Sequence, residues 1–379
     1  MNKTLKGITW DHPRGYQPLV ACSARYEREH NVRVEWYKRS LTEFGDQSLE
    51  ELCGTFDLLI IDHPHVGLGA YSGCIEPLNK ILSEDELSSF SDQSAGPSYF
   101  SYAYNGYQWA LPIDAAMQTA AYRPDLLSAG DIPYSWAQVF ELARSLAEKK
   151  QYVGMALSPT DCLCTFLTLT AQANSPICEH GSKLVDSAIG VAALRQMTKM
   201  KELFHPLCLE WTPVQLYDYM SYHNDLIYSP LSFCYNNYSR KGFGNCLIAF
   251  DNPPDIKNAV LGGAGIALSS TSTKKNLAKD YISWVCSTEI QRTVYIEEQG
   301  QPGNREAWLD ESANQISNNF FKNTIQAIQE SYVRPRYYGW TTFQTQLGNI
   351  IHDYLQVGGD EAEIIDQLDH LYQNSKLGL

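Results

Sequence analysis

This 379-residue sequence has no long hydrophobic run and no block of like charges. Because no apolar stretch approaches the roughly 18 residues of a membrane span, we expect no membrane insertion. The formal net charge is −14, which argues against nucleic acid or an anionic membrane surface as the main partner. No P-loop, GxSxG, HExxH or GxGxxG motif stands out, so the sequence predicts no cofactor and no metal site.

The first residues lack the basic region, apolar core and small-residue cleavage site of a secretory signal. The ten cysteines include no CxxC pair, and so many unpatterned cysteines fit a reducing compartment. The sequence as written therefore predicts a cytoplasmic protein, and a trimmed mature form would be extracellular or periplasmic. We expect most of the cysteines to be small buried hydrophobic residues.

Two short apolar segments each end in the tripeptide Asp-His-Pro. The segment LKGITW precedes Asp11 and His12, with Arg14 two residues further on, and the segment FDLLII precedes Asp62 and His63. The carboxyl ends of parallel strands lie on one edge of a sheet, and neighbouring strands are about 4.8 Å apart. We therefore predict that the two aspartates open onto the same cleft, with one of the two histidines close to them.

The first hundred residues alternate predicted strands and helices in the order βαβαβ, which implies a parallel sheet with right-handed crossovers. Later segments continue the mixed pattern. They are an extended stretch at 106–114, a helix capped by Ser135, a short strand at 153–159, helical and aromatic-rich segments to about 250, a buried strand at 261–270, helices at 274–286 and 288–300, and a final helix from near Thr342.

Several segments together resemble the family 1 solute-binding proteins of ABC importers. They are the strand and the EPLNKIL turn within 56–82, WALP and AYRPDLL within 107–127, the glycine-rich 262–267, the helix pair 278–295 and the late RPRY at 334–337. This resemblance covers nearly the whole chain. It implies an α/β, two-lobed, type II periplasmic-binding-protein-like fold with a ligand cleft between the lobes. The expected lobes are 1–112 plus 262–308, and 113–261 plus 309–379.

Ligands in a fold of this kind contact loops at strand ends and the crossover segments. The expected ligand-binding residues are Trp10, Asp11, His12, Arg14, Asp62, His63, Asp114, Asp161, Tyr235, Gly263 and Arg336. The aspartates would accept hydrogen bonds from hydroxyl groups, and Arg14 would clamp a carboxylate or phosphate. Aromatic rings would stack on sugar faces.

These candidates also have structural interpretations. Asp11 and Asp62 could each cap the turn or helix that follows. Arg14 could form a salt bridge to either of them. The histidines could donate hydrogen bonds that shape their loops.

The sequence favours a solute-binding protein that closes on a small polar ligand, a carbohydrate or a hydroxylated or carboxylated metabolite. An ABC permease would be its partner if the chain is exported. The alternative is a cytoplasmic enzyme on the same fold, in which Asp11, His12, Asp62 and His63 carry acid–base chemistry. Chemical turnover of a bound metabolite distinguishes the two hypotheses.

Overall fold

The structure, a computed structural model, describes residues 3–46 and 48–376, which form two compact units. Unit 1 comprises Met1–Ala116, Leu261–Lys322 and Arg336–Thr341, and unit 2 comprises Met117–Val260, Asn323–Pro335 and Thr342–Leu379. Four segments that were expected in the second lobe lie in unit 1, namely 113–116, 261, 309–322 and 336–341. Each unit is described below by itself.

Unit 1 is built around a sheet whose strands follow the order β2-β1-β3-β10. Strand β1 is parallel to both of its neighbours, and β10 is antiparallel to β3. The strands are β1 (Thr4–Trp10), β2 (Arg33–Arg39), β3 (Leu58–Ile61) and β10 (Leu261–Leu268). The parallel sheet and the βαβαβ order predicted for the first hundred residues are thus confirmed.

Strand β3 of this sheet is buried on both faces because it is apolar on both sides. Leu58 and Ile60 of β3 join a core with residues of α1 (Pro13–His30), α11 (Lys275–Val285) and α13 (Val294–Glu297). The alternate residues Leu59 and Ile61 join a second core with α3 (Leu49–Cys53). A continuous apolar run is what a strand covered on both faces requires.

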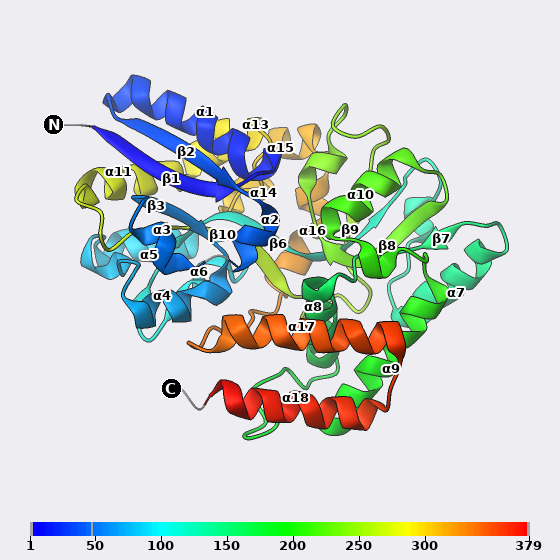
Figure 1. Ribbon diagram of the computed structural model, residues 1–379. Coiled ribbons are helices and arrows are strands. Elements are labelled where there is room, and N and C mark those ends of the chain that lie inside the picture. Colours follow the sequence, from blue (N-terminus) through cyan, green and yellow to red (C-terminus); the bar gives the residue numbers. More distant parts are fainter. Residues whose placement is uncertain (1–2, 47, 377–379) are drawn as a thin grey trace. The chain divides into compact units, whose positions relative to one another are not determined.

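The rest of unit 1 consists of short elements around this sheet, many of them labelled in Figure 1. They are α2 (Leu41–Asp46), η1 (His63–His65), α4 (Val66–Ser72), η2 (Leu78–Lys80), α5 (Glu84–Asp92), α6 (Ser98–Ser101), β4 (Ala103–Tyr104), β5 (Tyr107–Gln108), α12 (Thr288–Arg292), α14 (Arg305–Leu309) and α15 (Glu311–Ile316). Strand β6 (Leu111–Tyr122) runs from unit 1 into unit 2, as do residues of α16 (Phe320–Gln329).

In unit 2, β6 is antiparallel to β8 (Leu226–Phe233) and β9 (Ala249–Asp251), and β7 (Tyr152–Val153) is parallel to β8. The helix α8 (Pro159–Gln172) is buried along almost its whole length. The other helices are η3 (Ala129–Asp131), α7 (Trp136–Ala147), α9 (Ser187–Leu203), η4 (Cys208–Glu210), α10 (Pro213–Tyr222), η5 (Asn236–Ser239), α17 (Trp340–Val357) and α18 (Glu361–Ser375). Helix α17 passes so close to α8 that a Cβ on Gly348 would lie 2.5 Å from the Pro159 carbonyl oxygen.

Three sequence predictions of local structure were wrong. The strand expected at 153–159 is limited to Tyr152–Val153. The strand β8 lies in a segment that was expected to be helical and aromatic-rich. The helix expected at 288–300 is two short helices, α12 and α13. The helix capped by Ser135 is confirmed, because the Ser135 side chain accepts a hydrogen bond from the Gln138 backbone N–H.

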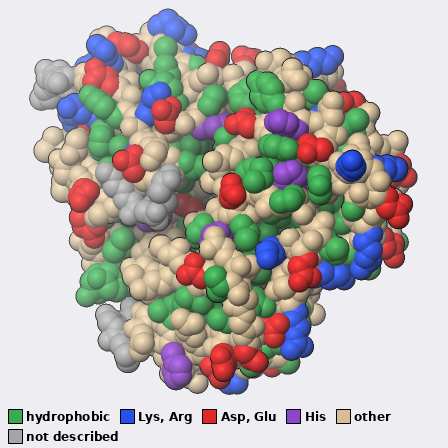
Figure 2. Space-filling view, turned by 45° about the vertical axis from the view of Figure 1, so that its right-hand side comes forward, with side chains coloured by type: hydrophobic (Ala, Val, Ile, Leu, Met, Phe, Trp, Pro, Cys, Tyr) green, Lys and Arg blue, Asp and Glu red, His purple; other side chains and the backbone are tan. Residues whose placement is uncertain are grey.

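Among the described residues, no helix is long and apolar enough to cross a membrane. The face shown in Figure 2 carries acidic and basic side chains interspersed with polar and hydrophobic ones.

Candidate functional site

The two Asp-His-Pro motifs follow neighbouring strands of unit 1 in matching register. Gly7 of β1 pairs with Leu58 of β3, and Ile8 pairs with Leu59. Continued by three residues, the same offset aligns Asp11 with Asp62. Both aspartates therefore follow the carboxyl edge of the parallel part of the sheet, as the sequence predicted.

In the first motif, Asp11 is exposed and its carboxylate lies 2.8 Å from the Lys38 ammonium group on β2. It does not cap the following helix. His12 takes that place, since its Nδ1 accepts a hydrogen bond of 3.1 Å from the Arg14 backbone N–H. The capping interpretation of Asp11 was therefore wrong.

His12 is held in its neutral form by its surroundings. Burial, reinforced by the nearby Arg14 charge and opposed by Asp11, lowers the pKa of His12 to about 3. A neutral imidazole is what the cap requires, because a protonated Nδ1 cannot accept the backbone hydrogen bond.

The residue before the first motif, Trp10, belongs to the hydrophobic core of unit 1. Its ring lies 5.1 Å from the Phe44 ring, measured between centroids. A Cβ on Gly15 would lie 2.3 Å from the indole, so the helix α1 passes directly over the ring. This packing explains the position of Trp10 without a ligand.

In the second motif, the residue roles are shifted by one position. Asp62 is the cap, and its Oδ1 accepts a hydrogen bond of 2.8 Å from the His63 backbone N–H at the start of η1. The Asp62 side chain remains 18% exposed, whereas the His63 side chain is fully buried with its Nδ1 3.2 Å from the Asp62 carboxylate. His65 is buried as well. The capping interpretation of Asp62 is confirmed.

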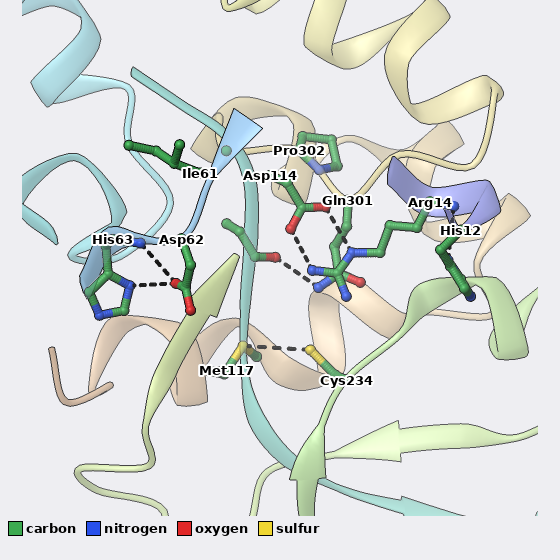
Figure 3. Close-up of polar contacts among 12 residues, drawn as sticks. His12, Arg14, Ile61, Asp62, His63, Asp114, Met117, Cys234, Gln301 and Pro302 are labelled. Carbon is green, nitrogen blue, oxygen red and sulfur yellow. Dashed lines mark hydrogen bonds and ion pairs between the residues drawn. The ribbon is translucent and has the colours of Figure 1, made fainter. Parts of the chain in front are cut away.

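A buried ion pair joins Arg14 to Asp114, on the part of β6 that belongs to unit 1 (Figure 3). The Arg14 Nε donates to Asp114 Oδ2 at 2.8 Å, and Nη2 donates to Oδ1. Arg14 is 4% exposed and Asp114 is 1% exposed. Burial raises the pKa of Asp114, and the Arg14 charge opposes that rise. The sequence suggested a salt bridge from Arg14 to Asp11 or Asp62, whereas this ion pair is with Asp114, a partner that the sequence had not indicated.

Two further residues hold this part of unit 1 together. Gly263 on β10 has a φ of +101°, and a Cβ there would lie 2.4 Å from the Asp114 carbonyl oxygen. Only glycine fits where β10 passes the backbone of Asp114 this closely. Gln301, which is fully buried, donates from Nε2 to the Ala115 carbonyl oxygen at 2.8 Å.

Arg336, also in unit 1, donates from its Nε to the Ala103 carbonyl oxygen at 3.2 Å. Its guanidinium carbon lies 5.1 Å from the centre of the Phe100 ring. Arg336 therefore ties its segment to α6 and β4.

Two predicted site residues lie in unit 2. Asp161, in the first turn of α8, is buried and accepts a hydrogen bond of 2.5 Å from the Ser158 hydroxyl. Burial raises the pKa of Asp161 to about 7, although the Ser158 hydrogen bond opposes the shift. Tyr235 is also buried, and its ring lies 6.4 Å from the Tyr217 ring. A ligand-binding role for either residue stays a prediction.

Sequence reasoning missed two polar residues near this edge of unit 1. Arg39 ends β2 beside Trp10 and is 5% exposed, with its Nη2 donating to the Ile60 carbonyl oxygen at 2.8 Å. The rule applied to β1 and β3, that polar residues at strand ends are site candidates, would have found it. Gln301 lies directly after the helix expected at 288–300, in the segment Gly-Gln-Pro-Gly, and no role was predicted for it from the sequence.

Among the described residues, no group of three or more His, Cys, Asp or Glu side chains could hold a metal ion. The expectation that the Asp11 and Asp62 carboxylates face one ligand stays a prediction.

Known structures of the same architecture were found by comparison. A solute-binding protein of an ABC transporter from Thermotoga lettingae TMO, bound with alpha-D-tagatose, matches with a TM-score of 0.82 at 15% identity, over 98% of this chain and 99% of that chain. T. maritima MalE3 with bound maltose matches with a TM-score of 0.82 at 15% identity, over 99% and 100%. A solute-binding protein from Agrobacterium radiobacter K84 in complex with ribitol matches with a TM-score of 0.82 at 17% identity, over 98% of both chains.

This chain has the solute-binding-protein fold. The mixed α/β periplasmic-binding-protein architecture expected from the sequence is therefore confirmed. No protein-family model matches the sequence, and no curated protein is similar to it in sequence. Since the identities are 13–17%, the structural likeness establishes the fold, and a fold alone does not specify a ligand.

Proposed function

We propose that this chain is a solute-binding protein that closes on a small, uncharged polyhydroxy ligand, a sugar or a polyol. The observation that carries the proposal is the match along the whole chain to proteins solved with tagatose, maltose and ribitol. These three ligands share a neutral carbon skeleton with several hydroxyl groups. Hydroxyl groups of this kind are well matched by carboxylates that accept hydrogen bonds.

The choice of a neutral ligand over an acid rests on Arg14. Its guanidinium group donates two hydrogen bonds, from Nε and Nη2, to the Asp114 carboxylate in a buried pair. Recruiting Arg14 to an anionic ligand would leave Asp114 buried without that partner, which costs several kcal/mol. Among the expected binding residues, Asp62 suits a ligand hydroxyl group better than a ligand carboxylate, because its own half-buried carboxylate, after the end of β3, accepts hydrogen bonds and repels an anion.

A melting-temperature screen tests this proposal. The panel contains tagatose, maltose and ribitol, matched with sugar acids and sugar phosphates of similar size. Because a ligand that binds only the folded state stabilises it, a neutral member should raise the melting temperature in proportion to the logarithm of its concentration. A rise with the acids and phosphates alone would contradict the neutral-ligand proposal. No rise with any member at millimolar concentration would contradict the solute-binding role itself.

The enzyme alternative makes a different prediction. His63 is fully buried and His12 is occupied as a helix cap, so neither imidazole is presented as an exposed acid or base. The binding proposal therefore expects the ligand to be recovered unchanged. Mass spectrometry after prolonged incubation with each hit of the screen measures this directly, and a new product would favour the enzyme.

We further propose that an ABC permease is the partner if the chain is exported. The support for this is that structural neighbours are components of ABC transporters. Cell fractionation of the natural host tests the location, and cross-linking to the permease in the extracellular or periplasmic fraction would support the partner.

A further inference from the structure

Cys53 and Cys74 are held next to each other in unit 1 by a single turn. The turn follows β10 at the amino-terminal side of β3, away from the Asp-His-Pro motifs. The Ser269 hydroxyl donates to the Cys53 carbonyl oxygen at 2.8 Å, and the Thr271 hydroxyl donates to the same oxygen at 2.5 Å. The Ser270 backbone N–H donates to the Cys74 carbonyl oxygen at 3.0 Å. The backbones of both cysteines are therefore fixed by the same three residues.

The Cys53 thiol also contacts the backbone of Cys74. The Cys53 Sγ lies 2.6 Å from the Cys74 carbonyl oxygen. Both residues belong to the core that α3 shares with the sheet, and both are free thiols. The Ser72 hydroxyl donates to the Cys74 Sγ at 3.1 Å.

We propose that Cys53 and Cys74 form a reversible intramolecular disulfide when a disulfide oxidant such as oxidised glutathione is present. The bond would close the loop from 53 to 74. This loop carries β3, η1 and α4, and so it includes Asp62 and His63 of the second motif. The disulfide would fasten this part of unit 1 to α3.

The chemistry has a defined order because the two thiols differ. Cys74 is 7% exposed, follows the exposed residues Ser72 and Gly73, and is the more accessible of the two. A hydrogen bond from the Cys53 thiol lowers the pKa of Cys74, whereas the pKa of Cys53 is raised. Since the thiolate is the nucleophile, Cys74 reacts first.

Oxidised glutathione is the oxidant in this thiol–disulfide exchange, and it accepts the two electrons that the cysteines lose. The Cys74 thiolate attacks one sulfur of oxidised glutathione, the glutathione S–S bond breaks, and one reduced glutathione leaves with the proton that Cys74 gave up. The Cys53 sulfur then loses its proton and attacks the Cys74 sulfur of the mixed disulfide, which releases the second reduced glutathione. The protein loses two electrons and two protons, and one oxidised glutathione becomes two reduced molecules.

The test uses the full-length folded protein and oxidised glutathione. Intact-mass spectrometry should show the loss of two hydrogen atoms with no glutathione adduct, and non-reducing peptide mapping should identify a Cys53–Cys74 cross-link. Dithiothreitol should reverse both. The melting temperature of the oxidised protein should rise by on the order of 5 °C, because the loop is closed in the unfolded state.

Single variants separate the two roles. Cys53→Ala should stop at a stable glutathione adduct on Cys74, and Cys74→Ala should leave Cys53 unmodified. Cys22→Ala, which removes another buried thiol of unit 1, should form the cross-link like the unchanged protein. An unreactive folded protein, a glutathione adduct that never resolves in the unchanged protein, or a cross-link between other cysteines would overturn the proposal.

Discussion

The same tripeptide, Asp-His-Pro, follows β1 and β3, and its residues have different roles at the two positions. After β1 the helix begins at Pro13, so His12 is the cap and Asp11 is left at the surface beside Lys38. After β3 the 3₁₀ helix begins at His63, so Asp62 is the cap and the imidazole is buried. A shift of one residue in the start of the helix moves the cap from the histidine to the aspartate, and the histidine is then buried. The comparison teaches that a motif specifies a set of groups, and the start of the next element decides which of them face solvent.

The residue that follows each Asp-His-Pro motif gives the largest expected contrast, because Arg14 forms a buried ion pair and the buried His65 occupies the equivalent place after β3. Arg14→Met should leave the Asp114 charge buried without its partner and lower the free energy of unfolding by about 3–5 kcal/mol. Urea denaturation followed by tryptophan fluorescence measures this. The double variant Arg14→Met with Asp114→Leu should recover part of the loss, and a single variant as stable as the unchanged protein would refute the account of the pair.

The two histidines should differ in their contribution to the free energy of unfolding, with the larger loss in the second motif. His63→Ala removes a fully buried ring and should cost about 2–3 kcal/mol of unfolding free energy, through the cavity left in the core. His12→Ala removes a cap and should cost about 1 kcal/mol. The same denaturation experiment compares the two variants. A larger loss at His12 than at His63 would contradict the assignment of His63 to the core and of His12 to the helix cap.

Lowering the pH should reveal the contribution of His12 to the free energy of unfolding. Its pKa in the folded state, about 3, is below the ordinary value of 6.5. Its contribution is therefore fully present above pH 6.5 and is lost as the pH falls toward 3, because the unfolded chain takes up the proton first. The expected loss at pH 4 is roughly 3 kcal/mol, because pH 4 lies 2.5 units below the ordinary pKa and still above the folded one.

The matched variant for this titration is His12→Asn, since asparagine caps a helix well and does not titrate. It should equal the unchanged protein at pH 7.5 and exceed it in unfolding free energy at pH 4. Carboxylates that titrate in the same range affect both proteins equally. Parallel curves for the two proteins from pH 7.5 to pH 4 would contradict a neutral His12 cap.

The aspartates should give the smallest effects on stability. Asp62→Ala removes the cap of η1 and should cost about 1 kcal/mol of unfolding free energy. Asp11→Ala removes an exposed ion pair and should leave stability unchanged within error. Equal losses at both positions in thermal unfolding would mean that Asp11 has a structural role that its contact with Lys38 does not explain.

Local patterns in the sequence were sufficient for much of the fold. The apolar runs of β1 and β3 and the cap at Ser135 predicted their elements because these depend on residues close in sequence. Strand β8 was missed because LIYSPLSF contains a proline and two serines, and its pairing with β6 shifts register at that point. A strand interrupted in this way has no clear alternating pattern.

The site was predictable in part for the same reason. Matching strand ends placed Asp11 and Asp62 on one edge, but the partner of Arg14 lies 100 residues away on β6. No short-range pattern carries that pairing. The cap at His12 was missed because histidine is not among the favoured capping residues, whereas the adjacent Asp11 is.

The central claim is that a neutral polyhydroxy ligand binds at the carboxyl edge shared by β1 and β3. Isothermal titration calorimetry with the best ligand of the melting screen tests it most directly, using the unchanged protein, Asp11→Asn, Asp62→Asn and, as the matched control, Asp280→Asn on the exposed side of α11. Asparagine keeps the cap at position 62 and removes the charge. We predict that Asp11→Asn and Asp62→Asn each weaken binding by about 10–100-fold, the effect of losing a hydrogen bond to a charged group, and that Asp280→Asn has no effect. Unchanged affinity in both the Asp11 and Asp62 variants would contradict the claim.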